Sequence, residues 1–155
     1  GRVEAQGSPR RGGGLSVGHD LSIVFDPTEA GANTVRAHLD AFNFARTGVD
    51  AWYPVNMLLK NARGEILGGV IAIAWGGWLG ISLVWVDEAL RGKGWATRLM
   101  DQAEAMGREK GCRWACLDTH SFQARPFYEK RGYEVFGTLD DYPEGHQKFF
   151  LRKKL

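Results

Sequence analysis

A glycine-rich turn gives the sequence its clearest chemical signal. It reads Arg-Gly-Lys-Gly-Trp-Ala over residues 91–96, and it follows an apolar run at 78–86 that has the composition of a strand. After it, apolar residues recur at helical spacing, at Ala96, Leu99, Met100, Ala103, Met106 and Gly107. The first turn of a helix has unpaired N–H groups and the positive end of the helix dipole. Because Gly92 and Gly94 leave the backbone accessible and Arg91 and Lys93 add charge, we expect a phosphate or pyrophosphate here. An ordinary basic surface turn is the alternative.

The spacing of this turn, Arg-x-x-Gly-x-Ala, resembles the acyl-CoA pyrophosphate loop of the GNAT superfamily of N-acyltransferases. A second block at 124–133, Ala-Arg-Pro-Phe-Tyr-Glu-Lys-Arg-Gly-Tyr, resembles the family segment A-x-x-F-Y-x-K-x-G-F/Y. The two blocks stand in the family's order, and the resemblance is strongest over 78–133. It implies acetyl-CoA as co-substrate and no metal. It also implies cofactor contacts at Val84, Trp85, Val86, Arg91, Gly92, Lys93, Gly94, Trp95, Ala96, Ser121 and Tyr128.

Acyl transfer to an amine needs a neutral amine, donors for the tetrahedral oxyanion and a proton for the leaving thiolate. Tyr128 resembles the tyrosine that lies near the CoA sulfur in many GNAT enzymes, so the resemblance implies that it protonates the thiolate. The alternative is that its ring only packs in the core. By the same resemblance, the oxyanion donor is a backbone N–H around Val84 to Val86.

The general base is harder to assign, because residues 78–86 hold no carboxylate where many family members carry one. His146 is the first candidate, since it follows a Pro-containing loop where some small-molecule GNAT enzymes have a catalytic histidine, and an imidazole titrates near neutrality. Asp118, with His120, is the second, acting directly or through water. Each candidate has a non-catalytic alternative. His146 is then a solvated loop residue, and Asp118 caps or braces the turn at Ser121. Ser121 itself stands where the family commonly has Asn, and a hydroxyl offers fewer contacts than an amide.

Length and composition fit one domain. The 155 residues are 44% hydrophobic, enough for a single core, and a net charge of +2 is too small to indicate a nucleic-acid or membrane partner. Neither a membrane-spanning run nor a signal-peptide pattern is visible. Cys112 and Cys116 lack C-x-x-C spacing, so we expect reduced thiols and a cytoplasmic location.

The elements that must position these residues follow from the hydrophobic periodicity. Strands are predicted at 21–25, 55–60, 65–75, 78–86, 113–118, 133–139 and 147–153, with helices after Asp26-Pro27 up to Thr47-Gly48, between the glycine turn and Gly111, and at 123–131. The helix between 78–86 and 113–118 makes those two strands a parallel pair. The fold class expected is α/β (α+β): a GNAT-like mixed, mostly antiparallel sheet of six to seven strands with a central parallel pair, flanked by helices.

Residues 21–155 are predicted to form a single GNAT-like acetyltransferase domain. Residues 1–20 are interpreted as a disordered tail or a remnant of cloning, with a basic arm as the alternative. The function expected is N-acetyl transfer from acetyl-CoA to a primary amine, by direct attack on the thioester. A small-molecule amine is the first choice of acceptor. A protein or peptide N-acetyltransferase and a non-catalytic acyl-CoA sensor stay open, as does a homodimer.

Overall fold

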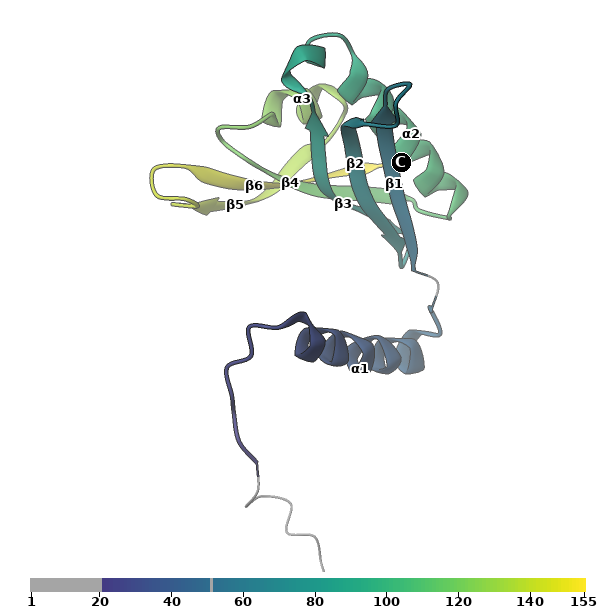
Figure 1. The fold of residues 1–155 in the computed structure, drawn as a ribbon, viewed down its shortest axis with the longest axis vertical. Coiled ribbons are helices and arrows are strands. Elements are labelled where there is room, and N and C mark those ends of the chain that lie inside the picture. The colour runs from purple at the N-terminus through teal and green to yellow at the C-terminus, as the bar shows by residue number, and fades with distance from the viewer. Residues whose placement is uncertain (1–20, 51) are drawn as a thin grey trace, which may run out of the picture. The chain divides into compact units, whose positions relative to one another are not determined.

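The protein is organised around one six-stranded sheet. A computed structural model describes residues 21–50 and 52–155. In chain order these form α1 (Glu29–Thr47), β1 (Tyr53–Lys60), β2 (Ile66–Trp75), β3 (Trp78–Val86), the single turn η1 (Glu88–Leu90), α2 (Trp95–Glu109), β4 (Trp114–His120), α3 (Arg125–Lys130), β5 (Glu134–Asp140) and β6 (Gln147–Lys154). Figure 1 shows the sheet with α2 along it. The chain forms two compact units that divide between Leu39 and Asp40, inside α1.

The strand order is β1-β2-β3-β4-β6-β5, and every neighbouring pair is antiparallel except β3 with β4. The predicted fold class, a mixed and mostly antiparallel sheet with a central parallel pair, is therefore confirmed. From β1 onward the observed strand ends lie within two residues of the predicted ones. The parallel pair follows from the length of α2, which carries the chain back across the sheet between β3 and β4.

The prediction of a strand at 21–25 is wrong. Residues 21–27 carry no helix or strand, and Leu21 and Ile23 are 82% and 104% exposed. Alternation and β-branched residues favour a strand, but a strand also needs a neighbour to pair with its backbone, and none of the described strands pairs with this segment. The predicted tail at 1–20 lies outside the described residues.

Helix α1 follows its predicted pattern. Asp26 Oδ1 accepts a hydrogen bond from the Thr28 backbone N–H at 2.8 Å, ahead of the first turn. Thr47 is the last helical residue, and the Gly48 N–H donates to the Phe44 carbonyl at 2.8 Å. No residue of α1 is buried. None of the helices in 21–50 and 52–155 is long and apolar enough to cross a bilayer.

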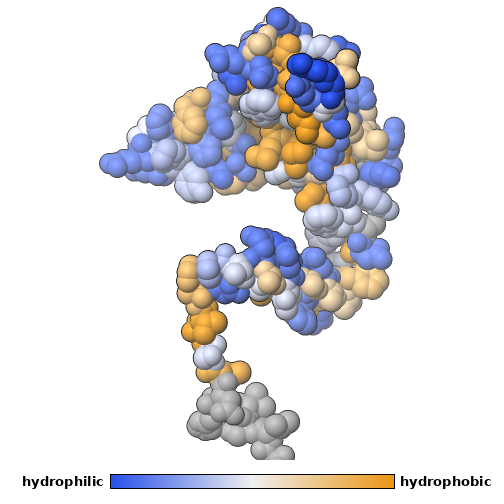
Figure 2. Space-filling view, viewed as in Figure 1, coloured by the Kyte–Doolittle hydropathy of each residue, from blue (hydrophilic) through white to orange (hydrophobic). Residues whose placement is uncertain are grey.

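The main core lies between the sheet and α2. Along β2, Val70, Ala72 and Ala74 are buried while the residues between them are only partly covered, as the two-residue period of a strand requires. On α2, a Cβ added at Gly107 would lie 3.1 Å from Leu79 Cδ2, so glycine lets helix and sheet approach closely. The opposite face of the sheet keeps large side chains such as Trp75 partly exposed, and hydrophobic surface is visible on the sheet body in Figure 2.

A buried carboxylate joins α2 to the elements beside it. Glu104 is 3% exposed; its Oε1 accepts from the Tyr133 hydroxyl at 3.0 Å and its Oε2 from Lys153 Nζ at 2.9 Å. Arg131 Nη2, just after α3, lies 3.2 Å from Glu104 Oε1. Burial, and then the Glu104 charge, raise the pKa of Tyr133, so its phenol donates as a neutral group. The network fixes α2 against α3 and β6.

Replacing the buried carboxylate should destabilise the fold strongly. In Glu104→Gln, Lys153 loses its counter-charge, while Arg131 keeps Asp101 Oδ1 at 2.8 Å from its Nη2. Breaking the largely buried pair of Glu104 and Lys153 costs about 3 kcal/mol or more. The control is Glu109→Gln, on the exposed side of the same helix. Urea denaturation should show a lower midpoint at an unchanged slope for Glu104→Gln alone. Equal midpoints for the two variants would contradict this reading of the network.

Candidate active site

The two parallel strands pair over only part of their length. Trp78–Ile81 of β3 pair with Trp114–Leu117 of β4, yet β3 continues to Val86 and β4 to His120. Past these pairs the strands diverge. Backbone groups on this edge of β3, from residue 82 to residue 86, therefore have no neighbouring strand to bond with and remain available to a ligand.

A β-bulge in β3 marks the place where the strands part. Ile71 of β2 pairs with Leu83 and Ala72 pairs with Ile81, which leaves Ser82 without a partner. The Ser82 hydroxyl donates to the Ile71 carbonyl at 3.0 Å and fixes the extra residue. Because a bulge bends its strand and increases the local twist, it accounts for the turn of β3 away from β4.

A cavity of about 880 Å³ lies at this divergence; we name it the strand cleft. Its volume is within the usual range for a small-molecule site. Five elements and the glycine turn contribute to it. The lining consists of residues 82–86 of β3, Leu90 of η1, Arg91, Gly92 and Gly94 of the turn, residues 95–97 of α2, residues 118–120 of β4, and Gln123, Ala124, Phe127 and Tyr128 at α3.

The glycine turn places the start of α2 at this cleft. Gly92 and Gly94 have φ of 71° and 81°, a conformation that favours glycine, and Gly94 is the N-cap of α2. The first helical bond is the Arg98 N–H to the Gly94 carbonyl. The N–H groups at the start of the helix have no helical partner, and residues 94–97 line the cleft. The turn thus provides the backbone donors and positive dipole end expected for a phosphate site.

The two basic residues of the turn have different places. Arg91 lines the cleft, and its Nε donates to the Val86 carbonyl at 3.0 Å, which connects the turn to the end of β3. Lys93 is absent from the cleft lining; its Nζ donates to the Ala89 carbonyl at 3.0 Å. Arg91 therefore holds the glycine turn to the end of β3, and Lys93 holds it to η1.

Tyr128 reaches the cleft from α3. Its side chain is 7% exposed, packed edge-on against the rings of Phe127 and Tyr133 at centroid distances of 5.1 and 6.1 Å. Burial raises the pKa of Tyr128, because the phenolate would lose hydration, so the phenol keeps its proton at neutral pH. The residue both packs in the core and presents a proton donor to the cleft.

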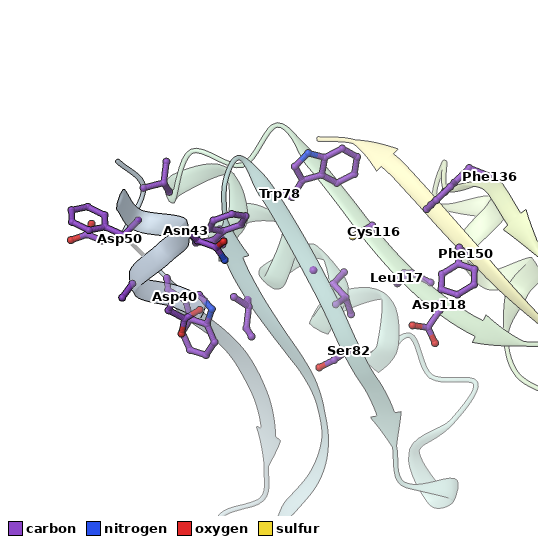
Figure 3. Close-up of a pocket in the computed structure, with 18 residues that line it drawn as sticks. Asp40, Asn43, Asp50, Trp78, Ser82, Cys116, Leu117, Asp118, Phe136 and Phe150 are labelled. Carbon is purple, nitrogen blue, oxygen red and sulfur yellow. The ribbon is translucent and has the colours of Figure 1, made fainter. Parts of the chain in front are cut away.

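Asp118 and Ser82 lie where the strand cleft meets a second pocket on the open face of the sheet, and Figure 3 shows them on neighbouring strands. The sheet wall of this second pocket, the sheet pocket, consists of Ile73, Trp75, Trp78, Gly80, Ile81, Ser82, Cys116, Leu117, Asp118, Phe136 and Phe150. The Asp118 side chain is 43% exposed and has Lys148 Nζ at 3.3 Å from Oδ1. A carboxylate thus stands at the junction of two hollows.

His146 and Ser121 belong to neither pocket lining. Ser121 Oγ accepts from the Gln147 N–H at 3.1 Å and lies 3.4 Å from His146 Nδ1. The Ser121 N–H also donates to the Gln147 carbonyl at 2.8 Å. Ser121 therefore fastens the end of β4 to the start of β6, and His146 sits beside that junction.

Gln123 is a cleft residue that sequence reasoning missed. Its Oε1 accepts from the His120 N–H at 2.8 Å and lies 3.2 Å from Thr119 Oγ1. Both of those residues also line the cleft. The sequence carries no local signal for this contact, because Gln123 precedes the N-cap residue Ala124 and accepts from the end of β4, not from the helix.

The arrangement suits anion binding joined to proton transfer. It offers free backbone N–H groups at a helix start, an open strand edge, a protonated phenol and a carboxylate. Within the described residues, no group of three or more His, Cys, Asp or Glu side chains is placed to hold a metal ion.

Comparison with known proteins agrees with this geometry. A sequence model described as "Acetyltransferase (GNAT) family" matches residues 29–133. An acetyltransferase of Agrobacterium fabrum is 32% identical over 133 residues, which cover 85% of this chain and 97% of that protein. A blasticidin-S acetyltransferase of Streptomyces morookaense is 40% identical over 94 residues, 60% of this chain and 69% of that protein.

A crystal structure of an acetyltransferase from Bacillus cereus matches the fold with a TM-score of 0.74 and 32% identity, over 86% of this chain and 98% of the other. The family model covers more than half of the chain. The matches to the Agrobacterium fabrum and Bacillus cereus proteins, each at 32% identity, cover almost the full length of those proteins. This chain belongs to the GNAT family of acetyltransferases.

Proposed function

We propose that the protein transfers an acetyl group from acetyl-CoA to a primary amine of a small molecule, by direct attack of the amine on the thioester. One observation carries the proposal. The strand cleft brings together a helix start with free N–H groups, the unpaired edge of β3, the phenol of Tyr128 and the carboxylate of Asp118.

The cofactor is proposed to enter along the α2 side of the cleft. Its pyrophosphate would meet the N–H groups of residues 94–97, where the helix dipole favours negative charge. Its pantetheine amides would pair with the open edge of β3 as a neighbouring strand does. The thioester would then lie between β3 and Tyr128, so that a backbone N–H of residues 84–86 receives the oxyanion and the phenol protonates the thiolate.

The acceptor is proposed to approach along the open face of the sheet, where Ser82 and Asp118 join the strand cleft to the sheet pocket. Large aromatic side chains and few charges line its sheet wall, which suits a small organic molecule. The blasticidin-S acetyltransferase among the relatives supports an acceptor of this kind.

Asp118 is the better placed of the two candidate bases. It lines both hollows, whereas His146 lines neither. A base must lie within hydrogen-bond reach of the ammonium, directly or through one water. We therefore propose that Asp118 receives the proton, with His146 as the alternative.

The cofactor assignment predicts a specific loss at Gly94. Acetyl-CoA should raise the melting temperature by mass action, with about 2.7 kcal/mol at 100 times its Kd. In Gly94→Val a side chain projects from the glycine turn that lines the cleft, and the shift should vanish. Gly64→Val is the matched control: its φ is +80° against +81°, and an added Cβ meets nothing within 4 Å at either glycine.

Both glycine variants should lose stability without ligand, because valine at positive φ is strained. Only the control should still gain stability from acetyl-CoA in differential scanning fluorimetry. A shift retained by Gly94→Val, or stabilisation by ATP and not by CoA, would overturn the assignment.

Removing the Tyr128 hydroxyl should slow turnover while leaving the fold intact. Tyr128→Phe keeps the ring that packs in the core, so the melting temperature and CoA affinity should hardly change. Loss of a general acid lowers kcat by roughly tenfold to a thousandfold. Since burial raises the pKa of Tyr128, its deprotonation should cause no fall in the wild-type kcat below about pH 9. Unchanged kcat in the variant would remove Tyr128 from the mechanism; no turnover with any amine would instead indicate an acyl-CoA sensor.

The two candidate bases are separated by isosteric substitutions. Asp118→Asn should lower kcat/KM by about a hundredfold or more, the range of general-base catalysis, and His146→Gln by less than tenfold. Release of CoA can be followed with a thiol reagent. If His146→Gln lowers kcat/KM more than Asp118→Asn does, His146 is the general base and the proposal for Asp118 is wrong.

A further inference from the structure

Four aromatic rings gather beside the end of β4: His120, Phe122, Tyr142 and His146, which we name the aromatic cluster. The His120 ring stacks on Phe122 at 5.1 Å and on Tyr142 at 5.6 Å, with interplanar angles of 19° and 17°. His146 meets Phe122 edge-on at 5.0 Å. Even so, Phe122 is 56% and Tyr142 49% exposed. Aromatic surface left in water at one place is a feature of ligand sites.

The cluster adjoins the proposed reaction site. His120 lines the strand cleft, and it follows Asp118 by two residues on β4, so the two side chains leave the same face of the sheet. Lys148 pairs with His120 across β4 and β6. Its Nζ lies 3.3 Å from Asp118 Oδ1 and 4.9 Å from the Tyr142 ring centroid, which connects the carboxylate to the rings.

The backbone holds the rings in place. Ser121 and Gln147 exchange a backbone bond of 2.8 Å and a side-chain bond of 3.1 Å, which fixes the turn that carries Phe122. In the facing loop, the Tyr142 N–H donates to the His146 carbonyl at 3.0 Å and the His146 N–H to the Pro143 carbonyl at 2.9 Å. A ligand would therefore find the rings already ordered and would lose little affinity to ordering them.

The surroundings are acidic. The loop that carries Tyr142 also carries Asp140, Asp141 and Glu144, and Asp118 lies on the strand beside it. Lys148 is already bound to Asp118 and covered by aromatic rings. The net negative charge favours a cation over an anion, and aromatic faces also attract cations.

We propose, building on the acetyl-transfer function above, that the aromatic cluster is the platform that selects the acceptor, and that the acceptor is a cationic amine with a planar aromatic ring. The ring stacks on the exposed faces of Phe122 and Tyr142, and the ammonium group reaches towards Asp118. The cluster thus determines which amines are acetylated, and residues 120–122 and 142–146 are specificity residues.

A matched pair of primary amines tests the platform. 2-Phenylethylamine and 2-cyclohexylethylamine have the same carbon skeleton and charge, and only the first has a planar π-system. With the full chain and saturating acetyl-CoA, kcat/KM for the phenyl amine should be about two- to tenfold higher, the range that aromatic pairing gives. In the presence of CoA, the phenyl amine should also shift the imidazole C–H resonances of His120 and His146 in proton NMR spectra, and the cyclohexyl amine should not.

Variants assign that preference to the cluster. Phe122→Leu and Tyr142→Leu remove a ring but keep apolar volume, and each should bring the ratio of the two kcat/KM values close to one. Tyr53→Leu is the control, because Tyr53 is 43% exposed, similar to Tyr142, and lies on β1, an edge strand separated from β4 by β2 and β3. It should keep the wild-type ratio.

The outcomes separate this inference from the function on which it rests. Equal kcat/KM values for the two amines, without the NMR shifts, would overturn the platform and leave acetyl transfer standing. An equal loss for both amines in the leucine variants would also overturn it, since the rings would then serve structure alone. Phenyl-specific NMR shifts without turnover of any amine would support the platform and refute acetyl transfer.

Discussion

The site depends on one structural constraint, the divergence of β3 and β4 within an otherwise continuous sheet. The pair is bonded up to Ile81 and Leu117, and the bulge at Ser82 then bends β3 away. A closed sheet would have satisfied these backbone groups and left no cleft. The opening leaves them unpaired and places them next to the start of α2, where further N–H groups are free. A ligand with both a phosphate and amide groups would satisfy the two sets together.

Such an opening needs support, because a sheet gains stability from each strand it pairs. The Glu104 network provides part of it by binding α2 to Tyr133, Arg131 and Lys153 with charge-assisted hydrogen bonds. These residues follow α3 directly or lie on β6, so the network holds both helices that border the cleft. Tyr128 contacts the Tyr133 ring, and its position therefore depends on the same buried carboxylate.

Much of this site could be predicted from the sequence, since its signals are local. The glycine turn and the block around Tyr128 each lie within ten consecutive residues, and the helical stripe after Gly94 is read from spacing alone. The bulge at Ser82 gives no such signal, because the strand reads as one apolar run. The position of His146 relative to the cleft depends on the pairing of β6 with β4 and β5, which local sequence does not determine. The strand expected at 21–25 was wrong for the same reason: local composition favoured it, but pairing is a tertiary condition.

Hydrogen exchange followed by mass spectrometry, with and without acetyl-CoA, tests the central claim most directly, since it measures the backbone groups on which the cleft depends. If the open edge of β3 and the start of α2 bind the cofactor, acetyl-CoA should slow exchange in peptides that cover residues 82–86 and 92–98. The β1–β2 hairpin around Gly64 should be unaffected. Protection confined to other parts of the sheet, with these two segments unchanged, would contradict the account.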